Sequence, residues 1–385
     1  MQICAVGDVA PRRDDPAAIF ADAAPWLRSA DLAFGQMECP LSDRGAPSPQ
    51  ARLAMRTSPA VAAILRESGF GVMSIAGNHV LDYGAEALAD TLTAFAGAGL
   101  PVCGAGPTLA EARRPAFVDA GGKTVAVLAY SSILPAGYAA EAARPGCAPL
   151  RAHTIYEQVE LDQPGTPPRI HTFAERRDMA AMAQDVAAAR KTADVVLVSV
   201  HWGIHFVRAE VAHYQRELAQ AAVSAGADAV IGHHPHLLKG MEFIAGKPVF
   251  YSLGNFAIEQ PAAFDETIRD HASFAHLQTL SSGWKPEAKY QTPPETRHTA
   301  IAWLDFTGSN GPAVTLQPFR IDDDSVPRLL GPTDPDHAEW LDYLKAITSE
   351  AGLPTRYVAE ADGTVTCLPI AHNFQPPISD AMMTH

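Results

Sequence analysis

The sequence predicts an α/β fold, because short apolar runs alternate with amphipathic stretches along most of the chain. Apolar residues make up 47% of the 385 residues, which is enough to bury a sizeable core. Several apolar runs also stop abruptly at histidine, carboxylate or asparagine side chains. In the clearest case, the run at residues 230–231 leads through Gly232 into His233, His234 and His236. Because ligands of α/β sheets gather beyond the carboxyl ends of the strands, such segments mark the expected site.

The first part of the chain is predicted to alternate between strands and helices. The helix near residue 58 has Pro59 in its first turn, where proline is well tolerated, and Gly69 at its end. The expected strands are residues 2–7, 30–35, 70–76 and 124–130. The expected helices are residues 17–28, 58–68 and 85–98.

The later part of the chain continues this alternation and then changes character. We expect strands at 194–200, 228–231 and 247–253, helices at 173–193, 214–225 and 336–350, and an antiparallel pair at 299–306 and 314–321. Two stretches have little periodicity: residues 135–170 predict a long surface excursion, and residues 260–298 predict an insertion or lid. We therefore divide the chain into a catalytic domain at 1–325, which includes the lid, and a C-terminal helical extension and tail at 326–385.

Composition and charge narrow the function classes. The net charge of −14 argues against nucleic acids and anionic membranes as partners, because both normally need a basic surface. The five cysteines are scattered without a C-x-x-C pair, which predicts reduced core residues. The N-terminus begins a strand directly, without the basic and apolar regions of a signal peptide, so we expect a cytoplasmic location. No pattern indicates an oligomeric state.

Polar groups of metal-ligand type follow separate apolar runs. A single group of this kind has an ordinary explanation as a turn or cap residue, but their joint placement at one edge of one sheet predicts a metal site. Their mixture of oxygen and nitrogen ligands suits Mn, Fe or Zn, as one ion or two. Two ions about 3.5 to 4 Å apart can bind both an attacking hydroxide and a substrate oxygen. The groups are Asp8, Glu38, Asn78 with His79, His201, His234 with His236, and Asn255.

Six short motifs at these positions occur in a known order. They are Gly7-Asp8, Met37-Glu38-Cys39-Pro40, Gly77-Asn78-His79-Val80-Leu81-Asp82-Tyr83-Gly84, His201-Trp202-Gly203, Gly232-His233-His234-Pro235-His236 and Tyr251-Ser252-Leu253-Gly254-Asn255-Phe256. Together they resemble the CapA-type proteins of poly-γ-glutamate capsule biosynthesis, which belong to the calcineurin-like metallophosphoesterase superfamily. The resemblance covers residues 1–260. It implies a four-layer α/β/β/α metallophosphoesterase-like sandwich with metals at the strand ends and a late insertion or lid.

The resemblance also implies a role for each motif residue. Ala10 stands where the superfamily usually has a histidine, and Glu38 replaces the usual bridging aspartate, as in capsule-type members. The first metal site is therefore short of a ligand, which leaves open whether one ion or two bind. The implied roles are Asp8 and His236 on one metal, Glu38 as the bridge, Asn78, His201 and His234 on the other metal, and His79, oriented by Asp82, as a proton donor or oxyanion contact.

Our leading functional hypothesis is a metal-dependent hydrolase, in which a metal-activated water attacks an ester, amide or phosphoester of a small molecule or peptide. An anionic substrate is among the alternatives. Two other hypotheses stay open: a metal-dependent peptide or amino-acid epimerase, and a non-catalytic accessory protein of polyglutamate capsule synthesis or export. We also have expectations for residues near these ligands. His205 and His213 lie at the surface or behind the ligands, His233 supports its loop, Trp202 packs the site wall, Cys39 is a buried neighbour of Glu38, and Arg297 with His298 could meet an anionic substrate.

Overall fold

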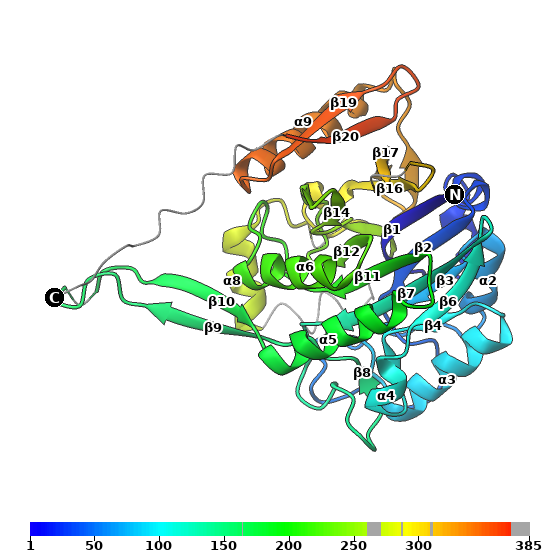
Figure 1. Cartoon of the computed structure of the whole chain (residues 1–385), viewed down its shortest axis with the longest axis horizontal. Helices are drawn as coiled ribbons and strands as arrows, with labels where there is room; N and C mark the ends of the chain where they lie inside the picture. Colours follow the sequence, from blue (N-terminus) through cyan, green and yellow to red (C-terminus); the bar gives the residue numbers. More distant parts are fainter. Residues whose placement is uncertain (164, 260–270, 286–287, 309–310, 371–385) are drawn as a thin grey trace.

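The protein has an α/β fold, as predicted, built on two large β-sheets that pack face to face (Figure 1). The computed structural model describes residues 1–163, 165–259, 271–285, 288–308 and 311–370. We call the sheet that contains the N-terminal strand the first sheet, and the other the second sheet. Strands of the first sheet contact strands of the second, and helices cover both outer faces. The assignment to the metallophosphoesterase superfamily remains a prediction from the motifs.

The first sheet has ten strands within the described residues. Eight of them follow the order β19-β20-β17-β16-β1-β2-β3-β4, while β15 pairs with β1 and β18 pairs with β17. From β1 to β4 the strands are parallel, whereas β16 and β17 form the antiparallel pair that the sequence predicts. The bounds are β1 Gln2–Ala10, β2 Leu32–Met37, β3 Val72–Ser74, β4 Val102–Cys103, β15 Asn255–Ile258, β16 His298–Asp305, β17 Ala313–Ile321, β18 Pro327–Leu329, β19 Thr355–Ala359 and β20 Val365–Pro369.

The second sheet has the order β13-β14-β12-β11-β7-β6, and its central strands are parallel. Neighbouring residues of its strand β11 point into different cores. Val195 and Leu197 pack between the two sheets, while Val196 and Val198 pack under the outer helices. Burial on both faces explains the continuous apolar run seen in the sequence. The bounds are β6 Ala116–Ala120, β7 Lys123–Ser131, β11 Val195–His201, β12 Ala229–His233, β13 Met241–Ile244 and β14 Lys247–Phe250.

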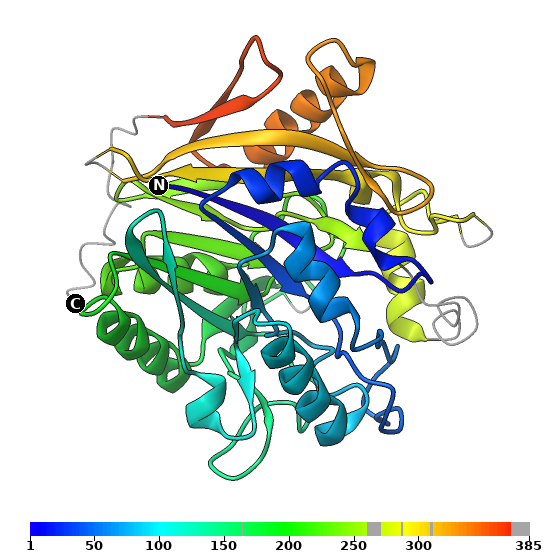
Figure 2. The same ribbon diagram turned by 90° about the vertical axis from the view of Figure 1, so that its right-hand side faces the viewer.

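The helices form the outer layers. Helices α5 and α6 pack on the second sheet, α1 packs on β2, and α9 packs on the late strands of the first sheet (Figure 2, orange). The predicted helix at 17–28 is instead two short helices, because Pro25 suits only a first helical turn. The bounds are η1 Pro16–Phe20, α1 Ala24–Ser29, α2 Val61–Ser68, α3 Gly84–Gly97, α4 Leu109–Ala112, α5 Arg176–Ala189, α6 His213–Ala225, α8 Ala272–Leu280, η2 Pro294–Arg297 and α9 Pro335–Glu350.

The predicted surface excursion at 135–170 contains strands that the sequence interpretation missed. Strand β8, at Gly146–Cys147, pairs with β5 at Ala105–Gly106. Strands β9, at Ala152–Glu157, and β10, at Arg169–Ala174, form a hairpin that extends away from both sheets (Figure 1). Both faces of this hairpin are largely exposed, so its sequence carries no alternation between buried and exposed positions.

The segment after residue 325 is more than a helix and a tail. Strand β20 pairs with β17, so residues up to 369 extend the first sheet around α9. The boundary at residue 325 stays a prediction. Of the predicted lid, residues 260–270 lie outside the described residues, and the described remainder includes α8 and η2. The predicted tail from residue 371 onward also lies outside the described residues.

The described residues bear on two further sequence expectations. All five cysteines are free and buried, in agreement with reduced core residues. Burial raises the pKa of the Cys39 thiol, which keeps it protonated beside Glu38. Among the helices that the structure describes, none combines the length and apolar character needed to cross a membrane.

Candidate metal centre

The predicted site residues converge where the carboxyl ends of parallel strands from both sheets meet. Asp8 lies near the end of β1, where it is in register with Asn255 of β15, and Glu38 follows β2. His201 is the last residue of β11, and His233 is the last residue of β12. The expectation that all of these groups share one edge of one sheet is therefore wrong. The apolar runs alone do not show which sheet each strand joins.

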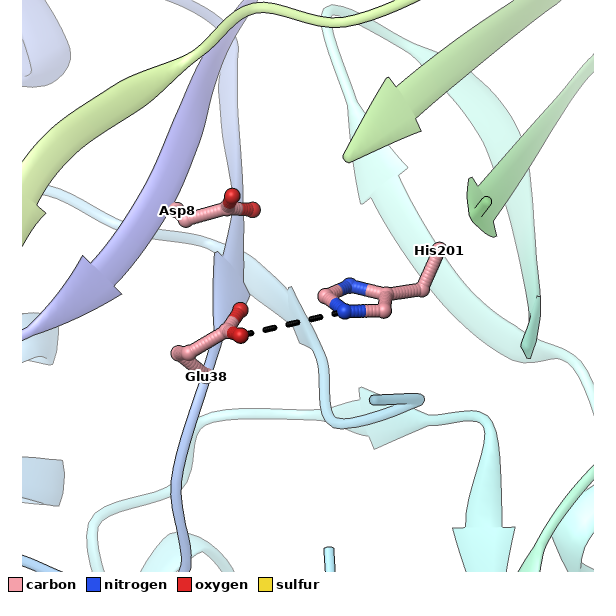
Figure 3. Close-up of side chains that lie close together, drawn as sticks. All are labelled: Asp8, Glu38 and His201. Carbon is pink, nitrogen blue, oxygen red and sulfur yellow. Dashed lines mark ion pairs between the residues drawn. The ribbon is translucent and has the colours of Figure 1, made fainter. Parts of the chain in front are cut away.

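Asp8, Glu38 and His201 form a buried cluster that could hold a metal ion (Figure 3). One ligand atom from each of the three side chains lies within 4.8 Å of the others. The distance between Glu38 Oε1 and His201 Nε2 is 3.7 Å. The three residues come from β1, the end of β2 and the end of β11, so both sheets contribute to the cluster.

Glu38 is the most informative member of this cluster. Its side chain is buried, with a relative exposure of 2%, and neither carboxylate oxygen has a hydrogen-bond partner among the described residues. Burial, together with the nearby carboxylates of Asp8 and Asp82, raises the pKa of Glu38 well above its usual range. A buried carboxylate without partners costs several kcal/mol. A bound cation would offset this cost, and the oxygen and nitrogen atoms around Glu38 are of the kinds that bind metal ions.

Two more predicted ligands, Asn78 and His234, converge on His201. Asn78 Oδ1 lies 2.6 Å from His201 Nε2, and His234 Nδ1 lies 3.1 Å from the same nitrogen. Burial, reinforced by the surrounding imidazoles, lowers the pKa of both histidines well below the usual range. Their neutral rings therefore have nitrogen lone pairs available for a metal.

His236, Asn255 and His233 surround Asp8 on the other side of the cluster. His236 Nδ1 lies 2.7 Å from Asn255 Oδ1 and 3.6 Å from Asp8 Oδ2. His233 Nδ1 lies 3.0 Å from Asp8 Oδ1, so this histidine contacts a predicted ligand directly as well as belonging to its loop. Ala10 is fully buried in the core and offers no ligand atom.

The backbone around these side chains is unusually constrained. A Cβ atom on Gly232 would lie 2.4 Å from Trp202 Nε1, so only glycine fits between the histidine loop and the buried indole. Trp202 is anchored by donating a hydrogen bond of 3.0 Å to the Tyr251 carbonyl. His234 and His236 have φ angles of 95° and 57°, in the left-handed region that costs about 1–3 kcal/mol per residue. The surrounding packing must supply this energy.

His79 and Asp82 form a hydrogen-bonded pair beside the cluster. His79 Nδ1 lies 2.5 Å from Asp82 Oδ2, and His79 Nε2 lies 4.0 Å from Glu38 Oε1. Asp82 is itself held by the Met55 backbone N–H, at 2.7 Å, and by the Tyr138 hydroxyl, at 3.2 Å. The arrangement fits an imidazole whose tautomer is set by a fixed carboxylate. Sequence reasoning missed Met55 and Tyr138, because no local pattern links them to Asp82.

A cavity of about 360 Å³ opens onto the cluster. Glu38, Asn78, His79 and His236 line it together with apolar side chains and the cation of Arg52. His205 also lines it. The ring centroids of His205 and His234 are 3.8 Å apart, and the His205 Nε2 atom is buried without a hydrogen-bond partner among the described residues.

Four residues that were predicted to lie near the site, three histidines and an arginine, differ in their distance from the cavity. His205 lies next to the ligands, whereas His213 begins α6 and contacts His171 away from the cavity. Neither Arg297 nor His298 lines the cavity, so the expected contact with a substrate there is not supported. Arg297 instead pairs with Asp323 at 2.6 Å.

His298 should make stability depend on pH. Its ring is buried against Tyr343, with ring centroids 4.4 Å apart, and burial lowers its pKa from 6.5 to about 4. Above pH 6.5 the neutral ring costs the folded state nothing. As the pH falls from 6.5 towards 4, the free energy of unfolding decreases, because the unfolded chain takes up the proton at a higher pH than the folded chain does. We expect His298→Phe, which keeps an aromatic ring, to remove about 3 kcal/mol of this dependence. Urea unfolding of both proteins between pH 4 and 8 measures it, and parallel curves would contradict the assignment.

Comparison with known proteins identifies the family. The family described as bacterial capsule synthesis protein matches residues 2–260, which is more than half of the chain. The chain belongs to this family. The matched residues include strands β1 to β15, which belong to both sheets, and they include every predicted ligand from Asp8 to His236. The CapA-type resemblance drawn from the motifs is thus confirmed.

Individual relatives of this capsule synthesis family member share about 30% of its residues over the aligned parts. The PGA biosynthesis protein CapA of Bacillus subtilis is 30% identical over 63% of this chain, and the capsule biosynthesis protein CapA of Bacillus anthracis is 28% identical over 63%. The chain covers 57% and 54% of their lengths. A probable polyglutamine synthesis accessory protein of Mycobacterium tuberculosis is 30% identical over 78% of this chain and 67% of its own length.

Proposed function

We propose that this protein is a metal-dependent hydrolase that uses Mn, Fe or Zn. The observation that carries the proposal is Glu38, a buried carboxylate with two unpartnered oxygens, next to Asp8 and His201 at an open cavity. Such an arrangement is costly without a cation. Enzymes commonly place perturbed titratable groups of this kind where chemistry occurs.

The roles that we propose follow from the contacts. Asp8, Glu38, Asn78, His201 and His234 would hold the metal, with His236 beside Asp8 as a further ligand. When bound, a divalent metal lowers the pKa of water to about 7 and polarises a substrate oxygen.

The chain's own contribution to proton transfer would come from His79. Its Nδ1 is fixed by Asp82, so its Nε2 is the atom that faces Glu38 and the cavity. When its Nε2 also carries a proton, this ring can give that proton to a leaving group and become neutral, a step worth about 10²- to 10⁴-fold in rate. Met55 and Tyr138 would keep Asp82 in place through the transfer.

For the substrate, we propose an amide of a glutamate-containing compound ahead of an ester or phosphoester. Two relatives bear names that refer to capsule or PGA biosynthesis, and the M. tuberculosis relative is named for polyglutamine synthesis. Arg52, at the cavity, offers a positive charge that could meet a substrate carboxylate.

Metal analysis provides the first test. Protein purified without chelator should contain at least about one equivalent of Mn, Fe or Zn by plasma mass spectrometry. His201→Ala should lose most of it, because His201 contacts three other proposed ligands. The matched control His213→Ala, outside the cavity, should keep it. A metal-free protein that takes up none of these ions would rule out the proposal.

Replacing His79 tests the chemistry separately. His79→Ala should keep the metal but lower the hydrolysis rate of a γ-linked oligoglutamate by at least about 100-fold. Hydrolysis in heavy-oxygen water labels the new carboxylate. If deuterium from heavy water appears at an α-carbon instead, the epimerase alternative is correct. Loss of the metal from His79→Ala would contradict the role given to His79.

An accessory role is the second candidate function, favoured by the name of the M. tuberculosis relative. In that case the protein would bind metal and oligoglutamate without turning the polymer over. Equilibrium dialysis with labelled oligoglutamate, alongside the activity assay, separates the two proposals.

A further inference from the structure

Among the described residues, strand β9 has an open edge on the outside of the molecule. It belongs to the two-stranded β9–β10 hairpin and pairs with β10 as its strand neighbour within the described residues. The five residues from 153 to 157 are all exposed, including Ile155 at 50% and Tyr156 at 69%. A long exposed edge with apolar side chains is a ready template for pairing with another strand.

The hairpin is held so that this edge faces outward. Strand β10 packs on α6, where the Tyr214 N–H donates to Thr172 Oγ1 at 3.1 Å. The Ala174 N–H donates to Glu217 of the same helix at 2.9 Å. With β10 fixed to α6 on one side and to β9 on the other, the free edge belongs to β9 (Figure 1).

We propose that β9 pairs antiparallel with β9 of a second copy of this chain, about a two-fold axis through Ile155. In such a pairing, residues equally distant from Ile155 lie opposite one another. Ile155 then meets Ile155 of the second copy, and Glu157 lies opposite His153. Thr154 lies opposite Tyr156 on the other face. The hairpins would join into one four-stranded sheet.

The side chains of β9 make this pairing self-complementary. Residues 153, 155 and 157 lie on one face of the strand, so the pairing brings two apolar side chains together at the axis. A carboxylate and an imidazole then face one another on each side of that axis. No like charges lie directly opposite one another along residues 153–157.

A second copy also fits better than other occupants of the edge. The charges on the edge itself favour a second copy, because Glu157 of each strand lies opposite His153 of the other. Pairing with a second hairpin would extend the sheet to four strands and add to the support that β10 already receives from α6. The inference does not depend on the proposed catalytic function.

The oligomeric state of the whole chain is the direct test. Sedimentation equilibrium between about 1 and 100 μM should show a dimer. Ile155→Lys, which sets two lysines face to face at the axis, should raise the dimer dissociation constant at least about ten-fold. The matched control Ile170→Lys changes a residue on β10 that is 56% exposed and should leave the dimer intact. A monomer throughout, or a dimer equally stable in Ile155→Lys, overturns the proposal.

Crosslinking tests the register without relying on a destabilising change. In Ile155→Cys, the two new thiols lie opposite one another, and the five natural cysteines are buried. Mild oxidation should give a covalent dimer on a non-reducing gel, whereas Ile170→Cys should not. His153→Glu should weaken the dimer, because it places two carboxylates opposite each other, while His153→Lys should preserve it. Crosslinking of Ile170→Cys but not of Ile155→Cys would refute the register.

Discussion

Replacing Gly7 with Ala should cost at least about 3 kcal/mol of the free energy of unfolding, or prevent folding. A Cβ atom on Gly7 would lie 2.0 Å from the Gly254 carbonyl oxygen, which accepts the Asp8 backbone N–H at 2.9 Å. The obstacle is backbone, so no side chain can turn aside to relieve it. The strands β1 and β15 would have to separate, and with them Asp8 and Asn255. Urea unfolding followed by circular dichroism measures the loss.

Gly97→Ala is the matched control for this change. Gly97 lies in α3, where an added Cβ would meet no atom within 4 Å apart from its own helix backbone and chain neighbours, and alanine favours a helix over glycine by about 1 kcal/mol. The control should therefore be neutral or slightly stabilising. If the free energy of unfolding of Gly7→Ala lies within about 1 kcal/mol of that of the natural protein, the backbones of Gly7 and Gly254 are not in close contact.

Glu38→Gln should have opposite effects on the metal-free and metal-loaded protein. Without metal, the amide removes a buried carboxylate that lacks partners, so the free energy of unfolding at pH 7 should rise by about 1–3 kcal/mol. With metal, the substitution removes a proposed ligand, so the stabilisation on adding Mn or Zn should largely disappear. Thermal unfolding in chelator and at about 100 times the metal dissociation constant separates the two effects, because binding at that level contributes about 2.7 kcal/mol.

The pH dependence of the metal-free protein gives an independent check. Because the pKa of Glu38 is raised in the folded state, the metal-free protein should lose stability as the pH rises above 4.5 towards that raised value. Glu38→Gln should remove this loss. Glu86→Gln, at an exposed position, should change neither the pH dependence nor the metal effect. Equal metal stabilisation in Glu38→Gln and the natural protein would contradict the site.

Much of the fold could be predicted from the sequence, because most of its strands are buried on both faces. The apolar runs that became β1, β2, β11 and β12 are visible without any partner information. The β9–β10 hairpin and β19–β20 are among the strands that escaped prediction. In the hairpin both faces are exposed, so no alternation marks the strands.

The candidate site could also be predicted only in part. Residues at strand ends, such as Glu38 and His201, could be selected because a strand end has a defined place in an α/β sheet. The residues that surround these ligands could not be predicted. Tyr138 reaches Asp82 from a loop 56 residues away, and the His205 ring stacks on the His234 ring. Contacts of this kind depend on tertiary packing, for which the local sequence has no signal.

The central place of β1 in the first sheet has a consequence for folding. Asp8 is in register with Asn255, and Gln2 is in register with Asp305. Strand β1 therefore waits for two of its partners, β15 and β16, until about 250 to 300 further residues have been synthesised, and contacts of such long sequence separation slow folding. During synthesis, β1 and β2 have unpaired apolar edges, which are prone to aggregation. We expect a chaperone requirement to persist until most of the chain has emerged.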